Sequence, residues 1–422
     1  MSGQGAAQKG EEKLQVRKLA LLSFGAAALL ASAGIKSVSA APFLIVGNDE
    51  KLLWDDQGKP VIHPAGKDTV VILDLADPEN PKTLATLQMK NSVIGPPTNV
   101  AIDPTNSIAL VADSINVTRP EPPPAPAPKE GASAPPPPPA AAALKMGPDD
   151  KVYVIDLKAN PPKLANTVTA GKQPSGLCFN KTGSIALVTN RADKTVSVLA
   201  IKGTDVKATD TINIGGVATS CAFTPDGKHA LVTKFNEGKV SVLDVNGDKV
   251  TYSKLDLPTG PWPYNVRVSP TGIALTSDNG DAGSSDGSVD TTSVIDLEAK
   301  PMRIIDRVVV GDGPEGLAIS PKGNIAVSVI LAGSNNKPAY FYHRNGFLAV
   351  LHISGKKVRK VAEVEVGGLP EGAAFTPDGK YLYVGNYLDS DLSILRVHRG
   401  KITPVKRFKL PGHPASVGMS EK

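Results

Sequence analysis

Near its C-terminal end the chain reads Pro370-Glu-Gly-Ala-Ala-Phe-Thr-Pro-Asp-Gly379, followed by Lys380-Tyr-Leu-Tyr-Val-Gly-Asn386. One apolar strand runs into a Pro-Asp-Gly turn, in which proline presets φ and glycine accepts a positive φ, and a second strand leaves that turn. Five earlier runs align with the first, and they end on the turn residues Asn106, Gly183, Gly227, Gly272 and Gly323. The spacings between successive turn residues are 77, 44, 45, 51 and 56, which indicates a repeat of about 44 residues with insertions.

Each repeat contains four predicted strands. In the repeat that begins at Pro174, the first three strands are 177–179, 185–190 and 196–199, and a fourth ends in glycine before the next repeat begins. Abundant Gly (40) and Pro (37) fit many short strands joined by tight turns. Four-stranded units at this period are typical of propeller blades.

The two ends of the chain complete one blade. Pro414–Met419 matches a first strand that has no turn after it, while Phe43–Asn48 and Val70–Asp74 match a second and a third strand. Pairing between the two ends would leave no open sheet edge in the ring. We therefore predict an all-β fold, a seven-bladed β-propeller of four-stranded blades closed by pairing of the N- and C-terminal strands in one blade.

A resemblance to a known family follows from the second strands. The runs Tyr383-Val-Gly-Asn386, Leu187-Val-Thr-Asn190 and Ile45-Val-Gly-Asn48 resemble the Tyr-Val-Thr-Asn repeat that names the YVTN family of β-propellers. The resemblance covers essentially the whole chain after residue 40, and it implies the propeller fold. Relatives of this type include surface-layer proteins, lactonase-like enzymes and subunits of redox enzymes, so the resemblance leaves the function open.

The first forty residues have the pattern of a signal peptide. A basic region with Lys13, Arg17 and Lys18 precedes the apolar stretch 19–35, and Val38-Ser-Ala40 supplies small residues for cleavage. The alternative is an uncleaved membrane anchor, but the stretch is short and rich in alanine for a spanning helix. We predict a signal peptide at 1–40 that is cut after Ala40, and a periplasmic or secreted propeller at 41–422 with no further membrane span.

Removal of this peptide changes the charge balance. The whole chain has a formal net charge of +5, of which residues 1–40 contribute +3. The remaining +2 is nearly neutral and argues against a nucleic-acid partner. We expect a monomer.

Three long insertions follow predicted second strands, at 114–149, 279–290 and 331–345. In a propeller these loops lie on the face from which the first strands start, which we call the top face. The first insertion, at about 115–149, is rich in Pro and Ala and is expected to be disordered, either as a tolerated surface loop or as a docking site for a proline-reading partner.

The other two insertions suggest a cation site and an aromatic platform. The oxygen-rich loop 279–290 does not have EF-hand spacing, so we favour a solvated loop over a bound cation and predict no metal site. Tyr340-Phe-Tyr-His-Arg344, in the third insertion, is expected to pack on a neighbouring blade, with a stacking platform or lid as the alternative.

The candidate binding residues surround the starts of the first strands. Arg267 stands where other repeats have Ala, Gly or Cys, and a charge there needs a partner. The nearby residues able to bind a small polar or anionic ligand with it are Glu315, Glu371, Trp262, Tyr264, Asn265, His413 and Asn99. The alternative is a structural Arg–Glu pair at the channel mouth.

Sequence motifs for catalysis are missing. The chain has no Cys-x-x-Cys-His haem motif and no Gly-x-Ser-x-Gly elbow, so no catalytic residue and no cofactor is assigned. The leading hypothesis is a binding or scaffold protein that takes a small ligand or a protein partner on the top face. The alternatives are a lactonase-like hydrolase or isomerase, with His413 or a glutamate as base, and a subunit or maturation partner of a periplasmic redox enzyme.

The two cysteines lie in the first strands of consecutive repeats. Facing sheets are about 10 Å apart, whereas a disulfide needs Cβ atoms about 3.8 Å apart, so only the crowded axis of a propeller would allow a bridge. We predict that Cys178 and Cys221 are buried free thiols, with a disulfide as the alternative in an oxidising compartment.

Overall fold

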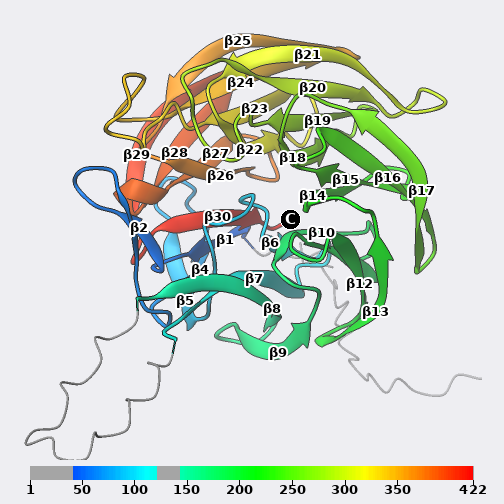
Figure 1. Ribbon diagram of the computed structural model, residues 1–422, viewed down its shortest axis with the longest axis horizontal. Helices are drawn as coiled ribbons and strands as arrows, with labels where there is room; N and C mark the ends of the chain where they lie inside the picture. The colour runs from blue at the N-terminus through cyan, green and yellow to red at the C-terminus, as the bar shows by residue number, and fades with distance from the viewer. Residues whose placement is uncertain (1–40, 121–142, 422) are drawn as a thin grey trace, which may run out of the picture. The chain divides into compact units, whose positions relative to one another are not determined.

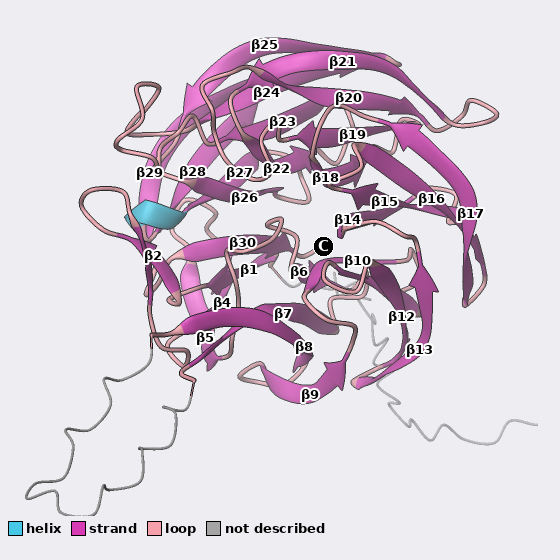
Figure 2. Cartoon of the chain, viewed as in Figure 1, coloured by secondary structure: helices cyan, strands magenta, loops and turns pink. Residues whose placement is uncertain are grey.

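The computed structural model describes residues 41–120 and 143–421. In this part of the chain, seven four-stranded antiparallel sheets are arranged in a ring, which confirms the predicted seven-bladed β-propeller (Figure 1). Figure 2 shows that strands dominate; the one described helical element is the 3₁₀ turn η1, Tyr387–Asp389. None of the described helical segments has the length and apolar character needed to cross a membrane. The predicted signal peptide lies outside the described residues.

The closing blade joins the two ends of the chain. Its strand order is β30 (Pro414–Met419), β1 (Phe43–Asn48), β4 (Thr69–Asp74) and β5 (Lys82–Gln88). The antiparallel register places Leu44 opposite Met419 and Val46 opposite Val417. Figure 1 shows β30 in red beside β1 in blue. The predicted closure is therefore confirmed.

The other six blades follow each other along the chain. The first two are β6–β9 (Val100–Ile102, Ile108–Thr118, Lys145–Asp156, Lys163–Thr169) and β10–β13 (Pro174–Phe179, Ile185–Asn190, Thr195–Lys202, Asp205–Asn213). The next two are β14–β17 (Ala218–Phe223, His229–Lys234, Lys239–Asn246, Lys249–Pro258) and β18–β21 (Pro263–Val268, Ile273–Asp278, Asp290–Asp296, Arg303–Gly311). The last two are β22–β25 (Pro314–Ile319, Ile325–Ile330, Phe347–Ser354, Lys357–Glu365) and β26–β29 (Pro370–Phe375, Tyr381–Asn386, Asp391–His398, Lys401–Lys409).

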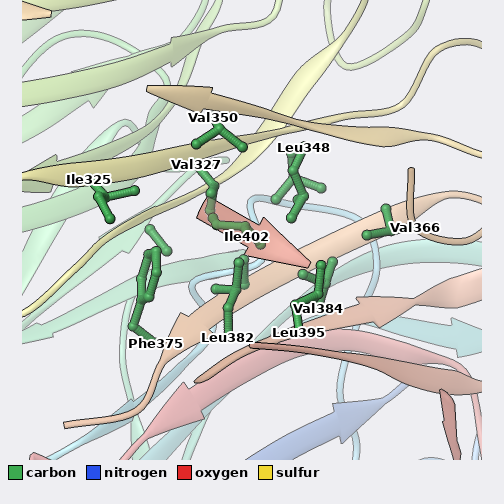
Figure 3. Packing of buried hydrophobic residues seen from close by; sticks show 13 residues of the cluster. Ile325, Val327, Leu348, Val350, Val366, Phe375, Leu382, Val384, Leu395 and Ile402 are labelled. Carbon is green, nitrogen blue, oxygen red and sulfur yellow. The ribbon is translucent and has the colours of Figure 1, made fainter. Parts of the chain in front are cut away.

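Apolar side chains between neighbouring blades form the core. Between the blades β22–β25 and β26–β29, Val327, Leu348 and Val350 of one sheet pack with Leu382 and Val384 of the other (Figure 3). The alternation of strand side chains lets each blade face both neighbours, so the apolar runs of the second and third strands are buried throughout. This packing holds the first strands around the axis.

The first insertion is shorter than the sequence analysis predicted. Strand β7 continues to Thr118 and β8 begins at Lys145, so the ends of the predicted disordered segment 115–149 are paired strands. Ile115 and Val117 are buried, and their opposite residues are Pro148 and Met146. The apolar alternation of Ile115 and Val117 extends β7 beyond the expected end of the second strand, and the proline-rich composition that follows hid this pattern. Residues 121–142 lie outside the described part of the chain.

The prediction of two free thiols is wrong. Cys178 of β10 and Cys221 of β14 form a disulfide, with their Cα atoms 5.8 Å apart. The expectation rested on the distance between facing sheets, which applies to the middle of a blade. Near the axis the first strands of neighbouring blades converge, and their Cα distance falls in the range that a disulfide requires.

The disulfide gives a direct chemical prediction. In denaturant without reductant, the protein should show no thiol that reacts with a chromogenic thiol reagent, and two should appear after reduction. Because the bridge closes a loop with a sequence separation of 43, reduction should lower the free energy of unfolding by about 2–4 kcal/mol. The Cys178→Ala/Cys221→Ala variant is the control, since reductant should leave its stability unchanged. Two reactive thiols in the unreduced protein would contradict the bridge.

Candidate functional site

The repeat places one side chain from each blade around the axis at the top face. The second residue of each first-strand run is at most 5% exposed; these seven residues are Thr98, Ser175, Thr219, Tyr264, Glu315, Glu371 and Ala415. They occupy equivalent positions in the repeat, at or just before the start of the first strands, which are the innermost strands of the blades (Figure 1). Three predicted site residues, Tyr264, Glu315 and Glu371, therefore come from the consecutive blades that start with β18, β22 and β26.

Glu315 and Glu371 form a buried carboxyl pair. Their side chains are hydrogen-bonded to each other. Burial raises the pKa of Glu315 to about 8, and burial together with the neighbouring carboxyl raises the pKa of Glu371 well above its usual range. A hydrogen bond between two carboxyl groups needs a proton on one of them, so the pair retains a proton at neutral pH. The Oε2 atom of Glu371 is buried and has no hydrogen-bond partner.

Arg191 is the cation of this site, and it comes from the loop after β11. Its guanidinium lies over the ring of Phe235, with Cζ 5.9 Å from the ring centroid. Its positive charge acts on Glu315 and Tyr264, where it opposes the rise in pKa that burial causes. The Nε and Nη1 atoms are buried and make no hydrogen bond. A cation with unused donors is suited to bind an anion.

Aromatic rings form one wall of the site. The ring of Phe235 lies 5.1 Å from the rings of both Trp262 and Tyr264, measured between centroids. Burial raises the pKa of Tyr264, so its phenol stays protonated. The backbone of Gly95 hydrogen-bonds to this phenol. A Cβ on Gly95 would lie 3.2 Å from Oγ of Ser175 and 3.5 Å from Nη1 of Arg191, and the residue has φ of 133°, which explains the glycine.

A cap that the sequence analysis did not anticipate packs near the carboxyl pair. It consists of the hairpin β2 (Leu52–Trp54) and β3 (Pro60–Ile62), inserted between β1 and β4, and of residues 91–97. Apolar side chains join it to the top-face loops; they are Leu52, Val93, Leu331, Leu369, Tyr387 and Ala415.

Buried polar contacts fix the cap in place. Lys51 forms ion pairs with Asp49, at 2.9 Å, and with Asp68, and all three residues are about 1% exposed. Asp49 also accepts a hydrogen bond of 2.8 Å from the backbone N–H of Val93. The hydroxyl of Tyr387 lies 2.7 Å from the carbonyl oxygen of Leu52.

Arg267 lies apart from the glutamates. Among the described residues it makes no hydrogen bond and no ion pair, and its charge does not act on Glu315 or Glu371. Burial lowers its pKa to about 10. The structure therefore shows no Arg267–Glu pair, and Arg191 occupies the place that sequence reasoning gave to Arg267.

The remaining predicted residues mainly hold loops. Asn265 accepts a hydrogen bond of 3.1 Å from Ser220, and Asn99 donates one of 2.8 Å to the carbonyl of Ser92. His413 lies with Nδ1 2.7 Å from the carbonyl oxygen of Tyr387. Trp262 reaches the site through its contact with Phe235. The sequence contained a signal for Arg191, since it directly follows the second strand β11, at the position where other blades have Phe235, Asn279, Leu331 and Tyr387.

The two other insertions contribute little to this centre. Directly before the second, Asp278 at the end of β19 is buried and accepts hydrogen bonds from Thr276, Thr291 and Ser293. No group of acidic, His or Cys side chains suited to a metal occurs in the described residues. In the third, Phe341 packs close to Gly287 and Gly333, as predicted for this aromatic cluster. Tyr340 differs, since it is 93% exposed.

The carboxyl pair predicts a pH dependence of stability. A glutamate whose pKa rises from about 4.5 to about 8 on folding stabilises the fold below pH 4.5, and this contribution is lost as the pH rises towards 8, by about 1.4 kcal/mol per pH unit for each retained proton. Denaturant unfolding of Glu315→Gln/Glu371→Gln at pH 5, 6, 7 and 8 should show a smaller decline than the wild type. Asp113 and Asp290, with pKa values of about 8 and about 7, contribute equally to both proteins. The exposed Glu237→Gln is the control, and equal slopes in the double variant and the wild type would contradict the buried pair.

Comparisons with known proteins support the fold. Neither a protein-family model nor a curated protein matches the chain. A candidate 6-phosphogluconolactonase of Bacteroides uniformis superimposes with a TM-score of 0.66 at 14% identity, over 90% of this chain and 99% of that one. A periplasmic gluconolactonase of Pseudomonas aeruginosa gives 0.60 at 14%, over 90% and 99%. Hydrazine synthase of Kuenenia stuttgartiensis gives 0.57 at 17%, over 79% and 92%. Structural neighbours of this chain thus include lactonase-like propellers.

Proposed function

We propose that this chain is an exported propeller of the YVTN-repeat type that binds a small, hydroxylated anion at the top of its axis. The observation that carries the proposal is Arg191, a cation with two buried nitrogen atoms that have no hydrogen-bond partner. Next to it the carboxyl pair holds at least one proton at neutral pH, so it does not fully neutralise the guanidinium. An anionic ligand would supply the missing acceptors.

The surroundings of Arg191 favour a sugar acid or a similar ligand. Carboxylate or phosphate oxygens match the fork of a guanidinium, and hydroxyl groups can donate to the free Oε2 of Glu371. The aromatic rings of Phe235, Trp262 and Tyr264 offer an apolar surface to the carbon skeleton. The gluconolactonase names among the structural neighbours agree with ligands of this class.

Calorimetric titration with gluconate and with 6-phosphogluconate tests this proposal. Arg191→Gln should weaken the binding of whichever ligand the wild type takes by roughly 10- to 150-fold, the range of one charge-assisted hydrogen bond of about 1.5–3 kcal/mol. Arg303→Gln is the matched control, because Arg303 is exposed on an outer strand. An Arg191→Gln variant that binds the ligand with wild-type affinity would contradict the proposal that Arg191 binds the anion.

A second candidate function is lactone hydrolysis, and the carboxyl pair favours it. With a pKa of about 8 for Glu315, the pair can both accept and donate a proton near neutral pH. In the hydrolysis, the oxygen of a water molecule would bond to the lactone carbonyl carbon and lose a proton to the ionised carboxylate. The ring C–O bond would then break, and the protonated carboxyl would give its proton to the departing alkoxide oxygen, which yields a hydroxy acid.

A pH-stat assay with δ- and γ-lactones of sugar acids tests hydrolysis separately from binding. Glu315→Gln/Glu371→Gln should lower kcat by about 100-fold or more with little change in KM, because general acid–base catalysis typically contributes 10²–10⁴-fold. Arg191→Gln should mainly raise KM. A wild-type rate equal to the spontaneous rate for every lactone, with binding of the acids intact, would eliminate hydrolysis and leave the binding function.

A further inference from the structure

A cavity lies between two blades at the face of the propeller opposite the top face. It occupies about 990 Å³ between β14–β17 and β18–β21, which are neighbours in the ring (Figure 1). Its walls include the turns 224–228 and 270–272, which follow first strands, and the turn 297–302, which follows a third strand. First and third strands of a blade run in the same direction, so these turns all lie at the lower face. Sites for small molecules have volumes of about 300–1,000 Å³, and we call this one the lower cavity.

Comparison with another pair of blades shows why this space is open. Where β26–β29 meets the closing blade, the hydroxyl of Tyr381 donates a hydrogen bond of 2.7 Å to Glu79, and Arg396 forms an ion pair with the same carboxylate. Tyr381 and Arg396 are opposite each other on the second and third strands. In the blade β14–β17 the equivalent pair is His229 and Asp244, whose side chains are smaller.

The turn on the other side of the cavity is also shorter. Residues 297–302 join β20 to β21, and they are one fewer than residues 75–81, which join β4 to β5. The longer turn contacts the preceding blade, where the hydroxyl of Tyr383 donates a hydrogen bond of 2.6 Å to the carbonyl of Pro78. The equivalent of Tyr383 on β15 is Leu231, which has no hydroxyl. Smaller side chains and a shorter turn therefore leave the lower cavity unfilled.

Apolar side chains form one part of the cavity wall. Val242 is buried, while Leu255, Leu297 and Met302 are half-buried and pack against the core between the two blades. These three side chains line the cavity and keep apolar surface that the core does not cover. The carbon skeleton of a ligand would remove this surface from water, which favours binding.

The charges with fixed positions in the wall are negative. The carboxylate of Asp226 accepts hydrogen bonds from the hydroxyl of Thr224, at 2.6 Å, and from the backbone N–H of Lys228, at 3.1 Å. The Oδ1 atom of Asp244 lies 3.2 Å from Nδ1 of His229. Within the described part of the chain, neither carboxylate forms an ion pair with a lysine or an arginine.

The other charged groups of the wall are less available or less fixed. Glu298 forms an ion pair of 3.3 Å with Lys356. Lys228 and Lys300 are exposed, and their ammonium groups are carried on flexible stems that can extend into water. A ligand in the cavity therefore meets two fixed carboxylates beside an apolar surface.

We propose that the lower cavity binds a small organic cation, an amine with an apolar or aromatic body. The body covers Leu255, Leu297 and Met302, and the ammonium group pairs with Asp244, with Asp226 as the second carboxylate of the wall. This site lies at the opposite face from the carboxyl pair and Arg191. It is separate from the top-face site and does not depend on the function proposed for it.

The probe for the test is 4-bromophenethylamine, whose bromine gives an anomalous signal. Crystals of the protein soaked in the probe should show a bromine peak in the lower cavity. In calorimetric titrations the wild type should bind the probe at least about 10-fold more tightly than 4-bromophenylacetate, which has the same ring and the opposite charge. Arg191→Gln should bind the probe with wild-type affinity, because Arg191 belongs to the top-face site.

Substitutions of Asp244 test the carboxylate. Asp244→Asn should weaken binding of the probe by about 2- to 5-fold, the range of an exposed ion pair. Asp244→Arg should weaken it by at least about 10-fold, because a like charge then stands in the wall. Asp205→Arg is the matched control on another blade, and it should leave the affinity unchanged. Asp244 and Asp205 are 53% and 56% exposed, so both arginine variants should keep the wild-type Tm.

Three results would each overturn the proposal. They are the lack of a bromine peak in the lower cavity, equal affinities for the amine and for 4-bromophenylacetate, and a folded Asp244→Arg that binds the amine as the wild type does. If Asp244→Arg does not fold, Asp244→Asn decides in its place, because asparagine keeps the size of the side chain and removes its charge. Wild-type affinity in Asp244→Asn would then overturn the proposal.

Discussion

Pairing of β30 with β1 is the constraint on which the rest of the molecule depends. It turns a linear array of sheets into a ring. It also buries Leu44, Val46 and Val417, from the two ends of the chain, against Tyr383 and its neighbours in the last complete blade. In an open array the outer faces of the first and last sheets would remain in water. Closure also fixes where the first strands meet. Residues that are about 44 positions or more apart in sequence become neighbours around one axis.

The polar groups at the top of this axis are arranged in an unusual balance of charge. Two carboxyl groups and one guanidinium could form a triad of ion pairs, yet Arg191 makes no hydrogen bond to either glutamate and rests on Phe235 instead. Burial disfavours the ionised carboxylates more strongly than the guanidinium stabilises them, so the pKa values of both glutamates are raised. The site therefore has the positive charge of Arg191 next to a carboxyl pair that retains a proton. This arrangement lowers the stability of the fold, and it suits the binding of an anion or a proton transfer to a substrate.

The repeat register explains which parts of the structure the sequence predicted. It defined the blades, their closure and the position of each first-strand residue along the propeller axis. It therefore predicted that Tyr264, Glu315 and Glu371 lie at one centre. The same register would have placed Arg267 three residues further along β18 than Tyr264. The sequence analysis considered the charge of Arg267 but not its position along the strand. Arg191 directly follows the second strand β11, at a position that the sequence analysis did not compare between the repeats. The disulfide between Cys178 and Cys221 was missed because a mean sheet spacing does not describe strands that converge on an axis.

The cap decides from which side a ligand can reach the centre. On the side of the closing blade, the hairpin β2–β3 and residues 91–97 are held by the buried ion pairs of Lys51 and by an apolar cluster, so opening there would expose both charge and apolar surface. Among the residues of the centre, Arg191 and Trp262 keep part of their surface exposed, although Gly95 of the cap lies close to the guanidinium of Arg191. Access is therefore expected between the loops that follow β11 and precede β18. A ligand that enters there meets the guanidinium first and the carboxyl pair second, which is the order in which an anion would be bound and then oriented.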